Sequence, residues 1–363
     1  MGLDSGVRKM PGSSARAMGI EFRKESSAYV LSDIKQLLLS NLWHRNWDDE
    51  TANRIFEWRY RDLDSEETVL AYDHGRPVAM VACSRHRWLL DGKVIRVREP
   101  ADWLCLPEFR HLGLGVLLMQ QLMNEPEPLL AIGGAVQAQT VLRAFGWRCL
   151  FEARSYLLPL SSRFFVNRIR GFVSKSNHSL HGLTSALRLP HPRLWRSQEI
   201  TWHELAPSEP LPETSIDALE YDLMPLIDER GMQWMQAAPK EMGSFFCLVF
   251  PAASRAAGLA IGRLFPYGGL RYVRLIHVQV PLPSVSGYCK VIRGTLRYAY
   301  DRGADVVQVR ASCPLLQGAL RAFWPNWSVP VATYWWEKNG ALPGAKCHLT
   351  FLRGDDGVLP YPI

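Results

Sequence analysis

The sequence predicts an α/β fold built from two consecutive copies of one unit, each with a central mixed sheet flanked by helices. Apolar runs of strand length alternate with amphipathic runs of helix length along most of the 363 residues. A glycine-containing turn joins the apolar run 102–107 to the helical run 116–123, as expected where a strand leads into a helix. A similar order of runs then recurs in the second half of the chain.

Composition divides the chain into four segments. Residues 1–19 contain several glycines and no apolar periodicity, so we expect a mobile leader there. The first copy is expected over residues 20–160 and the second over residues 199–363. Residues 161–198, rich in Ser, Arg, His and Gly, are expected to connect them. A chain of 363 residues can form more than one stable core.

The first copy is expected to begin with a short strand at Ile20, followed by two helices. Asp48 or Asp49 is placed to cap the second helix. Two apolar runs flank the turn Asp73-His-Gly-Arg-Pro77, which predicts a hairpin. The expected helices are 33–42, 49–60, 116–123 and 136–145, and the expected strands after Ile20 are 69–72, 78–84, 102–107 and 129–134.

The second copy repeats this order, and Trp234 precedes Phe245 by the same number of positions as Trp58 precedes Val69. The expected strands are 245–250, 255–264, 270–280, 306–310, 334–336 and 347–352, with helices at 291–300 and 315–323. One difference stands out. After residues 277–281 comes Leu-Pro-Ser-Val-Ser-Gly-Tyr-Cys, which has a single glycine where the first copy has two.

The turn Arg110-His-Leu-Gly-Leu-Gly115 predicts an anion site. Backbone N–H groups at a helix N-terminus have no intrahelical acceptor, and the helix dipole adds positive charge there. Glycine allows backbone conformations and close approaches that a Cβ forbids. The turn lacks the G-x-G-x-x-G and distal acidic residue of a dinucleotide-binding Rossmann fold, and it lacks the Gly-Lys-Ser/Thr of a P-loop.

The arrangement resembles motif A of the GNAT family of acyl-CoA-dependent N-acyltransferases, V-x-P-x-x-R-x-x-G-x-G followed by an amphipathic helix. Cys105 stands at the Val position, with Pro107, Arg110, Gly113 and Gly115 in register. The later strand 129–134, the helix 136–145 and Gly146-Trp147 match further landmarks, so the resemblance covers about residues 20–160. It implies two tandem GNAT-like domains, with acetyl-CoA bound by the first copy and a degenerate second copy. The second copy is then expected to shape the acceptor site or to hold a homodimer together.

The resemblance also implies roles for individual residues. Trp103, Leu104 and Cys105 would line pantetheine, and the backbone from His111 through Leu112, Gly113, Leu114, Gly115 and Val116 would hold the pyrophosphate beside Arg110. Glu99 and Asp102, on or near the motif strand, are the candidate general bases, and the alternative is that either is a solvated or strand-edge acid. Two family landmarks are missing, because Ala135 replaces a common Asn and Leu142 replaces a common Tyr.

The helix with Phe56-Glu-Trp-Arg-Tyr60 is the one that borders the acceptor pocket in the family. Its F-x-W-[KR]-Y pattern resembles GNAT enzymes of polysaccharide and amino-sugar modification. Trp58 and Tyr60 could stack on a sugar, and Arg59 could bind a phosphate or carboxylate. The alternative is a helix face that packs Phe56 and Tyr60 into the core.

Composition argues against several other classes of function. The net charge of +7 is spread without a basic run, which favours an anionic cofactor over nucleic acid. There is no apolar stretch of membrane-spanning length, and the cytoplasm is the expected location. The seven cysteines form no C-x-x-C pair, which predicts reduced thiols rather than disulfides or zinc. The histidines show no metal-ligand spacing, so no metal is expected.

The expected function is therefore transfer of an acetyl group from acetyl-CoA to the amine of a small polar or sugar-linked acceptor. Two alternatives stay open. One is a non-catalytic protein that uses a GNAT scaffold for ligand sensing or assembly, which the missing Asn and Tyr favour. The other is an aminoacyl transferase of the cell-wall type, although the glycine turn favours CoA over aminoacyl-tRNA.

Overall fold

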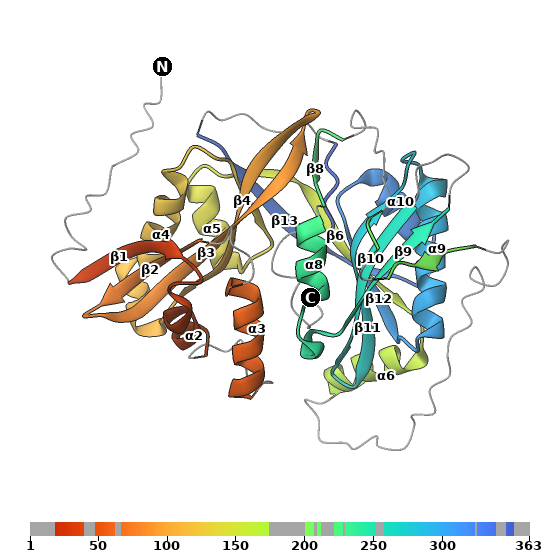
Figure 1. The fold of residues 1–363 in the computed structure, drawn as a ribbon, viewed down its shortest axis with the longest axis horizontal. Helices are drawn as coiled ribbons and strands as arrows, with labels where there is room; N and C mark the ends of the chain where they lie inside the picture. The colour runs from red at the N-terminus through yellow and green to blue at the C-terminus, as the bar shows by residue number, and fades with distance from the viewer. Residues whose placement is uncertain are drawn as a thin grey trace. The chain divides into compact units, whose positions relative to one another are not determined.

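The structure is a computed structural model. It describes residues 19–39, 48–61, 67–173, 200–206, 209–211, 221–227, 229–251, 258–323, 325–338 and 346–351 (Figure 1). The chain divides into two compact units, one from residues 1–84 and 100–125 and the other from residues 85–99 and 126–363. The expected leader, apart from Gly19, lies outside the described residues, as does the connecting segment after residue 173.

The first unit contains the predicted hairpin and both predicted early helices. β1 (Ile20–Ser26) pairs antiparallel with β2 (Glu67–Asp73), and β2 pairs antiparallel with β3 (Arg76–Leu90). The turn between β2 and β3 uses positive φ at His74 (47°) and Gly75 (83°). β4 (Lys93–Cys105) is the next strand, and it begins earlier than the predicted run 102–107 because β3 and β4 extend into a second hairpin.

Helices of the first unit cover the sheet with apolar faces. α2 (Leu31–Leu39) buries Ile34 and Leu37, whereas α4 (Leu114–Met123) buries Leu118 and packs on β2. α3 (Asp49–Arg61) begins where Asp48 Oδ1 accepts the Thr51 N–H at 2.7 Å, so Asp48 is the cap of the two predicted candidates.

The second unit is a mixed sheet flanked by helices, as predicted. Its strand order is β4-β5-β13-β6-β12-β11-β10-β9-β7, and β8 pairs with β3. The strands are β5 (Leu129–Ile132), β6 (Arg148–Pro159), β7 (His203–Glu204), β8 (Leu223–Pro225), β9 (Ser244–Phe250), β10 (Gly258–Tyr267), β11 (Leu270–Gln279), β12 (Val306–Ala311) and β13 (Trp327–Trp336). The helices are α5 (Val136–Ala144), α6 (Ser162–Val173), α8 (Glu229–Gln236), α9 (Val285–Asp301) and α10 (Pro314–Arg321), with a 3-10 turn at Lys240–Met242.

The last strand of each half pairs with the other half of the chain. The series β4, α4, β5, α5, β6 recurs as β11, α9, β12, α10, β13. However, β13 lies between β5 and β6, and β6 pairs with β12 (Figure 1). Pairing across residue 160 explains why the compact units differ from the segments 20–160 and 199–363.

One predicted strand of the second half is wrong. Residues 347–351 form no strand, and the only ladder contact of this segment among the described residues is an isolated bridge from Cys347 to Leu223. The segment is held instead by separate bonds. The His348 N–H donates to the Leu223 carbonyl at 2.9 Å, and the Leu349 N–H donates to Ser312 Oγ at 2.8 Å. Its alternating apolar pattern therefore reflects burial without a ladder.

The buried His348 side chain gives the stability of the protein a predicted pH dependence. Its Nε2 lies 2.9 Å from the Val278 carbonyl, which only accepts, so the ring carries a proton on Nε2. Burial lowers the pKa of His348 from 6.5 to about 4. Unfolding therefore takes up a proton between these values, and stability present above pH 6.5 is lost as the pH falls towards 4.

We expect the free energy of unfolding to fall by up to about 3 kcal/mol over this interval. Denaturant titrations at pH 7, 5.5 and 4.5 measure the change. His348→Gln retains an amide donor for the Val278 carbonyl but has no proton to gain, so its profile should be flatter. Equal slopes for the two proteins would contradict the assignment.

Candidate functional site

The glycine turn of the first unit leaves a helix N-terminus open. A 3-10 turn (Pro107–Leu112) leads to Gly113, whose φ of 69° lies in the left-handed region that favours glycine. The first backbone bond of α4 runs from the Leu117 N–H to the Gly113 carbonyl at 3.2 Å, and no side chain caps the helix. The N–H groups of residues 114–116 therefore have no intrahelical acceptor, and such groups suit an anion.

Gly115 also has a structural role next to Trp103. The Trp103 indole Nε1 donates to the Gly115 carbonyl at 3.0 Å, and a Cβ at residue 115 would lie 3.1 Å from that nitrogen. Glycine at this position therefore admits the indole, which ties the end of β4 to the first turn of α4. In the sequence the same glycine predicts a close approach of phosphate.

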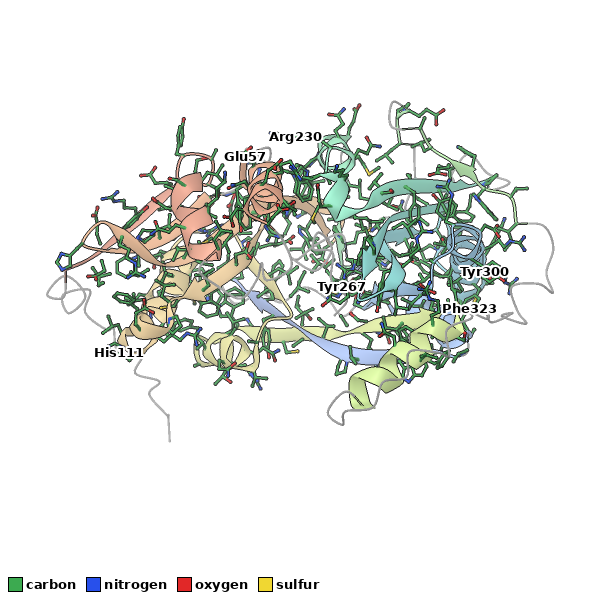
Figure 2. All side chains as sticks on the ribbon, turned by 90° about the horizontal axis from the view of Figure 1, so that it is seen from below. Glu57, His111, Arg230, Tyr267, Tyr300 and Phe323 are labelled. Carbon is green, nitrogen blue, oxygen red and sulfur yellow. The ribbon has the colours of Figure 1, made fainter. Side chains whose placement is uncertain are left out.

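The other predicted cofactor residues lie around this turn. Arg110 and His111 are exposed, and His111 is labelled at the outer edge of Figure 2. Arg110 Nε donates to the Cys105 carbonyl at 3.3 Å, so the motif arginine fastens the turn to the end of β4. Burial raises the pKa of the Cys105 thiol to about 11, which keeps it protonated at neutral pH. The remaining predicted side chains are partly buried, except that of Leu114, which lies in the core: Trp103, Leu104, Leu112 and Val116.

Asp102 carries the most unusual backbone of the site. It lies inside strand β4 with a φ of 45°, a conformation that few residues other than glycine adopt and that Asp and Asn tolerate best. Its carboxylate is almost fully buried, with 2% of the side chain exposed. Arg59 Nη2 lies 2.9 Å from Asp102 Oδ2, and the Tyr60 hydroxyl donates to the same oxygen. The strained backbone thus presents a carboxylate to two groups of α3.

The contacts of Asp102 bring together residues for which the sequence predicts two separate roles. Asp102 is a predicted base, whereas Arg59 and Tyr60 are predicted acceptor residues. The structure buries all three neighbouring side chains of α3, with exposures of 3% for Trp58, 7% for Arg59 and 1% for Tyr60. Their described contacts are therefore with the protein interior. In particular, Arg59 offers its charge to Asp102.

Glu99, the other candidate base, has a different environment. It belongs to the second unit, where its Oε1 accepts the Trp88 indole N–H at 3.0 Å. Its φ is not among the positive values found in β4. Asp102, by contrast, has the Arg59 cation and the Tyr60 hydroxyl at its carboxylate.

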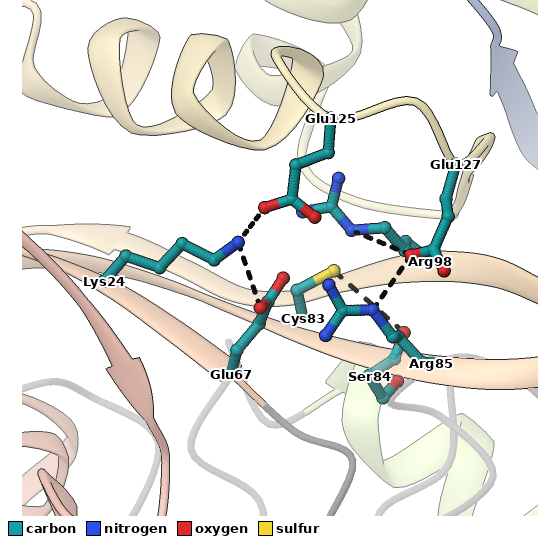
Figure 3. Close-up of polar contacts among 8 residues, drawn as sticks. All are labelled: Lys24, Glu67, Cys83, Ser84, Arg85, Arg98, Glu125 and Glu127. Atoms are coloured by element: carbon teal, nitrogen blue, oxygen red, sulfur yellow. Dashed lines mark hydrogen bonds and ion pairs between the residues drawn. The ribbon is translucent and has the colours of Figure 1, made fainter.

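Salt bridges connect strands of each unit with the segment just beyond α4. In the first unit, Lys24 pairs with Glu67 at 3.1 Å and also with Glu125, just beyond α4 (Figure 3). In the second unit, Arg85 lies 2.9 Å and Arg98 4.0 Å from Glu127 (Figure 3).

The described ladder between β4 and β5 is the single pair Arg98 and Leu129. Pro100 follows two residues later and has no N–H to continue it.

In α9, the corresponding helix of the second half, a serine side chain caps the N-terminus. Ser284 Oγ accepts the Gly287 N–H at 3.0 Å at the start of α9. A backbone donor that is open in α4 is therefore occupied in α9. The two halves thus differ at this helix N-terminus both in sequence, by the second glycine, and in structure, by the serine cap.

The described residues bear on three expectations, which concern metal ions, membrane-spanning helices and the state of the cysteines. In that part of the chain, no group of three or more His, Cys, Asp or Glu side chains is placed to hold a metal ion. No helix there is long and apolar enough to cross a membrane. All seven cysteines, at positions 83, 105, 149, 247, 289, 313 and 347, are free thiols in the structure.

Part of the chain matches the model of a known protein family. Residues 33–128 match the model of the Acetyltransferase (GNAT) family. The match begins in α2 and includes α3, Asp102, the glycine turn and α4. No curated protein matches the chain.

Solved structures resemble the chain over both halves. A protein of Enterococcus faecalis V583 described as a probable N-acyltransferase has a TM-score of 0.57 at 8% identity, covering 88% of this chain and 72% of its own. A GCN5-related N-acetyltransferase from Anabaena variabilis ATCC 29413 has a TM-score of 0.56 at 11% identity, covering 87% and 72%. Saccharomyces cerevisiae N-myristoyltransferase with bound myristoyl-CoA has a TM-score of 0.53 at 12% identity, covering 90% and 84%. At these identities the likeness establishes the fold.

Proposed function

We propose that the protein is an acyl-CoA-dependent N-acyltransferase that transfers an acetyl group to the amine of a small polar or amino-sugar-type acceptor. The observation that carries the proposal is the buried Asp102 carboxylate, held by Arg59 and Tyr60 in the same unit as the open N-terminus of α4. The GNAT match over residues 33–128 includes both features.

The residues of the turn fit a nucleotide-linked diphosphate. The N–H groups of residues 114–116 would donate to its oxygens, and the exposed Arg110 and His111 stand beside them. Acyl-CoA would supply an acyl group activated as a thioester. The partly buried Trp103, Leu104 and Cys105 would line its pantetheine arm by their position in β4.

Asp102 would act as the general base for the acceptor amine. Its carboxylate takes the proton of the ammonium group directly or through water, and the contact with Arg59 fixes the position of the carboxylate. The neutral amine nitrogen then attacks the thioester carbonyl carbon, so the C–N bond forms as the C–S bond breaks. The sulfur leaves as thiolate and is protonated by solvent, while the second amine proton is lost to water.

The proposal has two further parts, which concern the number of acyl-CoA sites and the location of the protein. The self-capped α9 supports one acyl-CoA site per chain, with the second half as the degenerate copy. The free thiols support a reducing location such as the cytoplasm.

The test follows release of free CoA thiol from acetyl-CoA in the presence of a panel of amines, including amino sugars. We expect acceptor-dependent release and a product that gains one acetyl group by mass spectrometry. Myristoyl-CoA serves as the long-chain comparison and should be a poorer donor. Saturable acetyl-CoA binding without acceptor-dependent release would identify the non-catalytic alternative instead.

A further inference from the structure

Buried arginines form a stripe across neighbouring strands of the second unit. Strands β10, β11 and β12 are neighbours in the sheet (Figure 1). Arg263 on β10 is the register partner of Arg274 on β11, and Arg274 is the partner of Gln308 on β12. Arg310 lies two residues further along β12, on the same face. The exposures of Arg263, Arg274 and Arg310 are 3%, 1% and 0%. Charged side chains are rarely this deeply buried.

Aromatic rings cover the flat faces of two of these guanidinium groups. Arg274 lies 5.2 Å from the ring centroid of Phe265 and 5.1 Å from that of Phe351, and Arg310 lies 4.4 Å from Phe351. Such contacts stabilise a cation through its faces and leave the N–H donors in the guanidinium plane. Burial lowers the pKa of Arg263 to about 10, so it still carries its charge at neutral pH.

Two neutral donors belong to the same face and lack partners. Arg274 Nε donates to Gln308 Oε1 at 3.0 Å, which fixes the orientation of the Gln308 amide. Gln308 Nε2 then has no partner in the described part of the chain, although the side chain is fully buried. The same holds for the hydroxyl of Ser155, which is 2% exposed and is the register partner of Arg310. Leaving such groups unsatisfied destabilises a protein.

We propose that this arginine stripe, formed by Arg263, Arg274, Arg310, Gln308 and Ser155, binds an oxyanion in the form of a carboxylate or phosphate group. Every member can donate, and the register pair Arg263 and Arg274 places two positive charges on this face. The Gln308 amide and the Ser155 hydroxyl supply the remaining donors to its oxygens. The site is separate from the acyl-transfer proposal and does not depend on it.

The anion has two possible sources, which share this chemistry. One is a free anion from solution. The other is the chain itself, because Asp355 and Asp356 follow Phe351 in the sequence, although they lie outside the described residues.

The test uses the full chain without acyl-CoA, titrated calorimetrically with inorganic phosphate and with citrate at constant ionic strength. For a free anion, the wild type should bind saturably, and Ser155→Ala and Gln308→Met should each bind roughly tenfold more weakly. Ser155→Ala removes only a hydroxyl, so it keeps the test valid if Gln308→Met does not fold. One control should bind like the wild type: Arg297→Gln, at an exposed arginine of the same unit.

For the chain's own carboxylates, the wild type should not bind either anion, and Asp355→Asn combined with Asp356→Asn should create binding that Ser155→Ala weakens. Two results overturn the proposal. One is the absence of saturable binding in both the wild type and the double variant. The other is unchanged affinity on introducing Ser155→Ala and Gln308→Met into whichever protein binds.

Discussion

Asp102→Asn is expected to slow acceptor-dependent CoA release by about 10²- to 10⁴-fold while acyl-CoA still binds. The substitution removes a proton acceptor that the fold buries beside Arg59 and Tyr60. Asn tolerates the left-handed conformation that residue 102 requires, so the backbone of β4 should be preserved. Single-turnover kinetics together with acetyl-CoA titration separate the chemical step from binding.

Two further variants test whether Asp102 or Glu99 is the general base. Tyr60→Phe removes one donor to the Asp102 carboxylate without a large change in volume, and we expect a loss of about tenfold. Glu99→Gln removes the other candidate carboxylate and keeps an acceptor for the Trp88 indole, so its rate should stay near that of the wild type. A large loss in Glu99→Gln with a normal rate in Asp102→Asn would reverse the roles of the two acids.

Local chemistry made much of the first unit predictable from the sequence. The hairpin turn, the Asp48 cap and the glycine turn each depend on a few adjacent residues whose preferences are strong. The open helix N-terminus followed from Gly113 for the same reason. The serine cap of the corresponding second-half helix is also local, since Ser284 and Gly287 are three residues apart, but it was not predicted.

Long-range arrangement was the part that the sequence did not reveal. The contact of Asp102 with Arg59 and Tyr60 brings together residues on separate elements, and no spacing rule predicts a positive φ within β4. β6 pairs with β12, and β13 pairs with β5, so the places of these two strands depend on pairing between distant parts of the chain.

Buried arginines were missed for a related reason. In strands, alternating polar residues normally face solvent, whereas here both faces of β10, β11 and β12 are covered.

Gly115→Val is expected to weaken acyl-CoA affinity by tenfold or more, on the order of 1.4 kcal/mol. A Cβ would lie 3.1 Å from Trp103 Nε1, and the branched side chain adds further atoms near the indole. The indole must then move away from the Gly115 carbonyl, which disturbs the end of β4 and the open turn of α4 together. Titration with acetyl-CoA measures the affinity, and circular dichroism checks that the fold is retained.

Trp103→Phe separates the two consequences of that change. It removes the bond to the Gly115 carbonyl without adding bulk, so its loss of affinity should be smaller than that of Gly115→Val. Gly287→Ala is the matched control in the second half, where the new Cβ would lie 3.0 Å from Ser284 Oγ and would disturb the cap of α9. That variant should lose stability and keep its acyl-CoA affinity. If it also lost affinity, α9 would belong to the acyl-CoA site, and the asymmetry between the open and the capped helix would not decide where acyl-CoA binds.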